Sequence, residues 1–147
     1  MTNTLHERAP YHRIRWISIV GGFMDGAKFE FAPGLNCIIG ARGTGKTTAL
    51  EFIRFALDAM PDDRDACKRI EGLVNRNLDF GRVEVGIETK DGLTYVVTRS
   101  LNDAPMVLSD EGTPTGITLK AGGFFAADIF SQNEVESIAD RSISQLE

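Results

Sequence analysis

The stretch Gly40-Ala41-Arg42-Gly43-Thr44-Gly45-Lys46-Thr47 fits the pattern G-x-x-x-x-G-K-[ST] of the phosphate-binding P-loop at every fixed position. Glycine lets the backbone turn tightly enough to direct a row of N–H groups at a triphosphate. Lys46 would add a positive charge for the β- and γ-phosphates, and the hydroxyl of Thr47 suits Mg²⁺. The stretch therefore predicts a site for a nucleoside triphosphate with Mg²⁺.

The segments on both sides of this loop fit the same interpretation. Residues 35–39 form a short, mostly apolar run after the turn signal Pro33-Gly34, and they predict a buried strand. Residues 47–60 have apolar side chains at helical spacing, and Pro61 ends the run. A strand before the loop and a helix after it are what a P-loop requires, because the helix N-terminus favours a bound phosphate. A glycine-rich surface turn would need both flanks to be coincidences.

Composition narrows the class of protein. A chain of 147 residues with 42% hydrophobic and 25% charged residues is typical of one globular domain. The net charge of -5 gives no basic footprint, so direct nucleic-acid binding by this chain alone is not indicated. Cys37 and Cys67 form no C-x-x-C pair, which favours reduced thiols and a cytoplasmic protein. No apolar run approaches the length of a membrane span, so no membrane partner is expected.

Outside the P-loop, the first half of the chain predicts a loose leader, two strands, a solvated charged connection, and a short helix followed by a turn. These are residues 1–10, 14–20, 28–31, 62–65, 69–74 and 75–77, respectively. In the second strand Phe29 and Phe31 alternate with charged residues, so we expect one face of it to be buried.

The middle of the chain predicts an antiparallel hairpin. Val83, Val85 and Ile87 alternate with polar residues or glycine and should share one buried face. The pair Asp91-Gly92 is a hairpin turn signal, after which residues 93–100 return as a second strand. This region is therefore antiparallel β structure and not an alternation of strands and helices.

The last third predicts further short strands and a final helix. Strands are expected at residues 106–108, 117–119 and 124–130. Apolar residues then follow helical spacing over residues 133–147, with Asn133 as the expected N-cap.

This order of elements resembles the N-terminal lobe of ABC-type ATPases. Within that class it looks most like the structural-maintenance-of-chromosomes (SMC) and RecF/RecN-type branch. Residues 31–40, Phe-Ala-Pro-Gly-Leu-Asn-Cys-Ile-Ile-Gly, are similar to that branch's approach to its P-loop, and residues 129–135, Ile-Phe-Ser-Gln-Asn-Glu-Val, look like its Q-loop. The resemblance implies an α/β P-loop NTPase with an antiparallel β subdomain. Residues 1–147 would form a single ATP-binding lobe, whose final helix, residues 133–147, leads to a coiled coil absent from this chain.

The resemblance also implies roles for individual residues. The loop residues around the phosphates of ATP would be Gly40, Ala41, Arg42, Gly43, Thr44, Gly45, Lys46, Thr47 and Thr48. Gln132 would reach the Mg²⁺ and the attacking water, so Gln132 and Lys46 are the expected catalytic residues, and Thr47 and Gln132 the expected metal ligands. Neither Arg42 nor Arg69 receives a role: we expect both side chains in solvent, and the alternative for Arg69 is a match to an arginine near the nucleotide or DNA in some relatives.

Two motifs of the family are missing from the sequence. There is no Ser-Gly-Gly signature, and residues 106–112 imitate a Walker B motif only in part, because Ser109 interrupts the apolar run and the run precedes the Q-loop. We interpret this segment as a β-turn with acidic residues. Both motifs normally lie in a C-terminal lobe. The expected partners are therefore that lobe of the same protein and a second ATPase head, with DNA bound only through the full assembly.

Three functions remain open from the sequence. The leading one is the ATP-binding half of a dimerising SMC/RecF-like ATPase that acts in DNA repair, chromosome handling or defence. The alternative is a complete small P-loop kinase, which would require alternating strands and helices around a parallel sheet. The third is a nucleotide-binding regulatory module that never hydrolyses ATP.

Overall fold

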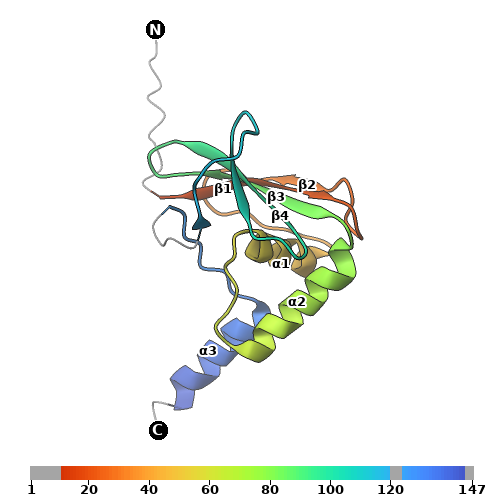
Figure 1. Ribbon diagram of the computed structural model, residues 1–147. Coiled ribbons are helices and arrows are strands. Elements are labelled where there is room, and N and C mark those ends of the chain that lie inside the picture. Colours follow the sequence, from red (N-terminus) through yellow and green to blue (C-terminus); the bar gives the residue numbers. More distant parts are fainter. Residues whose placement is uncertain (1–10, 120–123, 145–147) are drawn as a thin grey trace.

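The computed structural model describes residues 11–119 and 124–144 (Figure 1). Its elements, in chain order, are β1 Arg13–Val20, β2 Lys28–Glu30, α1 Lys46–Ala56, α2 Arg64–Leu78, β3 Arg82–Glu88, β4 Thr94–Ser100, β5 Met106–Ser109 and α3 Gln132–Ser144. The predicted leader at residues 1–10 and the last residues of the predicted final helix, 145–147, lie outside the described residues.

The strands form one sheet in the order β2-β1-β3-β4-β5, and every neighbouring pair is antiparallel. The predicted hairpin is confirmed: β3 and β4 pair over their whole length, and Gly92 in the turn has a φ of 80°, which glycine adopts without strain. Val83, Val85 and Ile87 each have 0% exposure, so the predicted buried face is also confirmed.

A row of apolar residues crosses the sheet and forms the centre of the core. Ile17 lies opposite Val85, Val85 opposite Val97, and Val97 opposite Val107, and all four are fully buried. Because side chains alternate between the faces of a strand, these residues share one face. Helix α1 packs against this face, and α2 packs beside α1, whereas α3 extends away from the sheet (Figure 1).

Helix α1 confirms the helix predicted after the P-loop, but it ends at Ala56 and not at Met60. Asp58 has a φ of 54°, a left-handed conformation that ends the helical path. Arg99 of β4 holds this end in place, because its Nη1 donates hydrogen bonds to Phe55 O at 2.7 Å and to Asp58 Oδ1 at 3.0 Å.

Helix α2 corrects two predictions. The expected solvated connection at residues 62–65 contains its N-cap, since Asp63 Oδ1 accepts a hydrogen bond from Ala66 N at 2.7 Å. The expected turn at residues 75–77 is helical, and Asn77 Nδ2 donates to the carbonyl of Leu73 within the helix. The helix continues because its buried residues recur at i,i+4 and anchor one face to the core: Ala66, Ile70, Val74 and Leu78.

Three predicted strands are absent from the described structure: residues 35–39, 117–119 and 124–130 have no strand assignment. A strand needs a neighbour for its backbone hydrogen bonds, and no described strand pairs with these segments. Leu35 and Ile39 are 93% and 92% exposed, so the apolar run before the P-loop is uncovered here.

Helix α3 begins at Gln132, one residue earlier than predicted, so the N-cap position is Ser131 and not Asn133. The carboxylate of Glu134 accepts a hydrogen bond from Ser131 N at 2.7 Å, the return half of a capping box. Among the described helices, none is long and apolar enough to cross a membrane.

Candidate functional site

The P-loop forms a compact turn around the head of its own lysine. Gly43 and Gly45 have φ values of 81° and 91°, which only glycine adopts readily. Lys46 Nζ donates hydrogen bonds to Gly40 O and Ala41 O, both at 2.6 Å. The ammonium group thus lies within the loop, and the partners it has among the described residues are two backbone carbonyls, which a stronger anionic partner could replace.

A cavity of about 830 Å³ opens beside this loop, between α1, α2 and the start of α3. It brings together three of the predicted site residues, Lys46, Thr47 and Gln132, which come from distant parts of the chain. Its lining consists of Asn36, Ile38, Lys46, Thr47, Leu50, Glu51, Ala66, Lys68, Arg69, Ile70, Gly72, Leu73, Arg76, Ser131 and Gln132.

The other predicted loop residues are close in sequence to Lys46 and Thr47, but they do not line the cavity in the described structure. They are Gly40, Ala41, Arg42, Gly43, Thr44, Gly45 and Thr48. Arg42 is exposed, as expected for a side chain in solvent. Arg69 is also exposed, but it faces the cavity and is therefore not merely a surface residue.

The charge of the cavity is opposite to that of the whole chain. Lys46, Lys68, Arg69 and Arg76 line it, against one carboxylate, Glu51, whereas the chain has a net charge of -5. Three of the four cations belong to α2, and the sequence interpretation did not place them at the site. The available signal was the seven-residue spacing of Arg69 and Arg76, which puts both on one helical face.

A buried cluster of charges adjoins the cavity through Glu51. Arg54 of α1 has 1% exposure, and its Nη1 lies 2.8 Å from Glu134 Oε2 and 3.7 Å from Glu51 Oε2. Its Nη2 donates a hydrogen bond to the carbonyl of Ile129. One arginine of the helix that follows the P-loop therefore contacts the chain just before and just after Gln132.

The pKa values of the two carboxylates in this cluster are shifted in opposite directions. Burial raises the pKa of Glu51, and the neighbouring Arg54 only partly offsets this effect. Burial would raise the pKa of Glu134 too, but hydrogen bonds from Arg54 and Ser131 outweigh it and lower that pKa to about 2. Arg54 is therefore paired mainly with the ionised carboxylate of α3.

The sequence interpretation missed Glu51 and Arg54, although a signal was present. Residues 49–57 are buried with the exception of the half-buried Leu50, and Glu51 and Arg54 are the only charged residues among them. Opposite charges at i,i+3 in an otherwise apolar helix indicate a buried pair, because charges are rarely buried without a partner.

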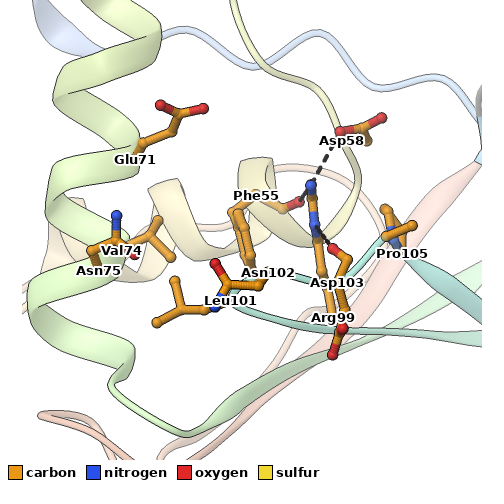
Figure 2. A pocket seen from close by; sticks show the side chains of 11 residues that line it. Phe55, Asp58, Glu71, Val74, Asn75, Arg99, Leu101, Asn102, Asp103 and Pro105 are labelled. Carbon is orange, nitrogen blue, oxygen red and sulfur yellow. Dashed lines mark hydrogen bonds and ion pairs between the residues drawn. The ribbon is translucent and has the colours of Figure 1, made fainter.

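A second cavity, of about 420 Å³, lies between α1, α2 and the end of β4 (Figure 2). Arg99 crosses it with its guanidinium 4.3 Å from the centre of the Phe55 ring, and Glu71 and Asn75 face it from α2. None of the predicted site residues lines this cavity. Its polar groups connect β4 to the end of α1, which is a structural role.

Comparison with known proteins defines the class of this chain. The sequence pattern of the AAA domain family matches residues 17–146, nearly the whole chain, so the chain belongs to that family. It is a P-loop ATPase domain of mixed α/β structure whose sheet is antiparallel.

The chain is also similar to one particular protein, the DNA double-strand break repair Rad50 ATPase of Thermoplasma acidophilum. The two sequences are 33% identical over 89 residues, which cover 60% of this chain and 9% of the relative. The chain thus matches less than a tenth of that relative's length. Together with the family match, this similarity confirms the predicted resemblance to the SMC-like, ABC-type ATPases.

Proposed function

We propose that the chain binds ATP with Mg²⁺ in the cavity beside the P-loop, as the ATP-binding lobe of an SMC/RecF-like ATPase. The observation that carries this proposal is the positive lining of the cavity, with Lys46, Lys68, Arg69 and Arg76 around one opening. A triphosphate has several negative charges in a row, and cationic side chains at close range are the groups that neutralise them.

The residues present fit both ATP and Mg²⁺. Backbone N–H groups of residues 40–48 would hold the phosphates, and Lys46 would exchange its two carbonyl partners for phosphate oxygens. Thr47 and Gln132 both line the cavity and offer oxygen ligands, which suits an ion that binds few protein groups and completes its shell with phosphate and water. When bound, Mg²⁺ neutralises charge on the phosphates. Gln132 would also orient the attacking water.

The exposed apolar segment before the P-loop supports a second lobe as partner. Leu35 and Ile39 are more than nine-tenths exposed in a run that has the pattern of a buried strand. A C-terminal lobe of the same protein that supplied a neighbouring strand would cover both side chains and satisfy their backbone groups. We extend the proposal to a second ATPase head and, through the full assembly, to DNA. Similarity to a DNA-repair ATPase supports this extension.

Calorimetric titration with MgATP tests the proposal. Removing the ammonium group in Lys46→Ala should weaken binding by about 10- to 100-fold, the range for losing a hydrogen bond to a charged group. Lys90→Ala is the matched control, because Lys90 is an exposed lysine next to the β3–β4 turn. Equal affinities of the wild type and Lys46→Ala would contradict the P-loop assignment.

The small-kinase alternative has less support. A kinase of this kind would place its strands in a parallel sheet separated by helices. In the described residues β3 and β4 are antiparallel and joined by a short turn. The third hypothesis, a regulatory module that never hydrolyses ATP, can be separated by experiment. ATP turnover by the longer protein that is abolished in Gln132→Ala would exclude this module.

A further inference from the structure

Arg54 connects the helix after the P-loop to the chain on both sides of Gln132. It is 1% exposed, and its Nε has no hydrogen-bond partner among the described residues, so its two terminal nitrogens make the contacts that offset the cost of burying the charge. Its Nη2 donates to the carbonyl of Ile129, and its Nη1 donates to Glu134 Oε2 at 2.8 Å. Both contacts cross from α1 to the segment that carries Gln132.

The contact with Glu134 also reaches the start of α3. The same carboxylate oxygen, Oε2, accepts the N–H of Ser131 at 2.7 Å, and Ser131 directly precedes Gln132. The side chain of Gln132 donates a hydrogen bond from its Nε2 to Glu136 Oε1 at 3.0 Å, within the same helix. In the described part of the chain, Arg54 and its two partners thus tie the position of Gln132 to the P-loop helix, together with the packing of Ile129 against the core.

Arg54 directs its hydrogen bonds to the segment around Gln132 and not to Glu51. Glu51 lies on the same helix, but its Oε2 is 3.7 Å from Arg54 Nη1 and makes no hydrogen bond to any described residue. The guanidinium therefore makes its hydrogen bonds to α3 and to the segment before it, and to Glu51 it makes only an ion pair at 3.7 Å. Well-packed apolar residues commonly stabilise a core as much as a buried ion pair does, so stability alone does not explain this charge.

We infer that Arg54 is a positioning residue, which holds Gln132 at the cavity by fixing the backbone before it and the helix cap after it. This inference rests on the proposed function, in which Gln132 reaches Mg²⁺ bound with ATP. Arg54 itself would touch neither ATP nor Mg²⁺. It would act by connecting α1, the helix after the P-loop, to the start of α3.

The test compares the ATP affinity of the chain with Mg²⁺ and in EDTA, by calorimetric titration. The ratio of the two affinities is the magnesium gain. In Arg54→Met this gain should fall about tenfold, as when a group that orients a metal ligand is removed, while the affinity in EDTA stays unchanged. Gln132→Ala should lose the same gain, and the double variant should lose no more than either single variant. Arg54→Lys keeps the positive charge but not the two terminal nitrogens of the guanidinium. Its magnesium gain should lie between those of the wild type and Arg54→Met.

A matched control separates positioning from stability. Arg99→Met removes another arginine that donates to a carbonyl of α1, Phe55 O at 2.7 Å, but on the side of the second cavity (Figure 2). It should lower the unfolding midpoint and leave the magnesium gain intact. If Arg54→Met does not fold, Glu134→Ala breaks the same link at a side chain that is 21% exposed, and it should lose the same gain.

Four results would overturn the inference: an unchanged magnesium gain in folded Arg54→Met or Glu134→Ala, additive losses in the double variant, an equal loss of the gain in Arg99→Met, or a wild type without any gain. Failure of the proposed function has a different signature, because the wild type would then bind ATP no better than Lys46→Ala under either condition.

Discussion

Arg54 Nη1 donates a hydrogen bond to Glu134 Oε2 at 2.8 Å, so a buried arginine of α1 is neutralised by a carboxylate in the first turn of α3. The two residues are 80 positions apart in sequence. Their contact is a tertiary link between the P-loop helix and the helix that leads away from the domain. It also makes the stability of the fold dependent on pH.

The unfolding free energy should fall as the pH drops from 4.5, the ordinary pKa of a glutamate, to about 2, the pKa of Glu134 in the folded chain. In this window the unfolded chain binds the proton first, so the contribution of Glu134 is complete above pH 4.5 and is lost as the pH falls through about 2. Its size should be about 1–3 kcal/mol. Urea unfolding across this window, on the wild type and on Glu134→Gln, checks the effect.

Glu134→Gln should show a smaller loss of stability on acidification than the wild type. The raised pKa of Glu51 acts with the opposite sign: its contribution is complete below pH 4.5 and is lost as the pH rises through the folded pKa. Because the charge of Glu134 is one cause of the raised pKa of Glu51, the Glu51 effect is smaller in Glu134→Gln; its loss lies above pH 4.5 and so outside the window that is compared. The same acid dependence in both would contradict the assignment of the low pKa to Glu134.

Asp63→Ala should lower the unfolding free energy by about 1 kcal/mol, the usual cost of losing an N-cap. The carboxylate of Asp63 accepts the N–H of Ala66 at 2.7 Å at the start of α2. Asp62→Ala is the matched control, because Asp62 precedes the cap and lies outside the helix. Chemical denaturation followed by circular dichroism measures both, and equal losses would contradict the capping role.

Gly86→Ala should destabilise the sheet and change the fluorescence of Trp16, the single tryptophan of the chain. A Cβ at Gly86 would lie 2.2 Å from Trp16 Nε1, so the indole must move. The expected loss is about 1–3 kcal/mol, as for other overpacked sites. Gly116→Ala is the control, since a Cβ there meets nothing within 4 Å. An unchanged emission maximum in Gly86→Ala would contradict the close packing of the ring.

The chain alone should bind ATP and hydrolyse it at close to the background rate. Asp110 and Glu111 follow β5 in a turn, where Asp110 accepts a hydrogen bond from Thr94, and neither lines the P-loop cavity. Each stabilising group missing from a phosphoryl-transfer site costs a factor of about 10² to 10³ in rate. Phosphate release by the purified chain measures this, with Lys46→Ala as the control for contaminating ATPases.

A C-terminal lobe added in trans should restore turnover, because the proposed function assigns the missing groups to that lobe. Release of phosphate at ordinary enzyme rates by the chain alone would instead mean that its site is complete. The hypothesis of a complete small P-loop kinase would then be favoured.

The sequence by itself determined the features that depend on short-range patterns. Glycines at fixed spacing specify the P-loop turn, since the left-handed conformations of Gly43 and Gly45 are local properties. Alternation around Asp91-Gly92 specified the β3–β4 hairpin, because its pairing needs only a turn and a period of two. The turn of the P-loop and the hairpin were therefore predictable without a structure, whereas phosphate contact by residues 40–48 stays a prediction.

Only the tertiary structure decided the features that depend on distant partners. Residues 35–39 have the pattern of a strand, but a strand exists only where another strand supplies hydrogen bonds. The cationic lining contributed by Arg69 and Arg76 depends on how α2 packs beside α1. The sequence marks Arg54 as a charge in an apolar helix, but it pairs that charge by spacing with Glu51 and gives no sign of Glu134. The pairing of Arg54 with Glu134 follows from burial against each other, because a charge removed from water needs a partner wherever the fold provides one.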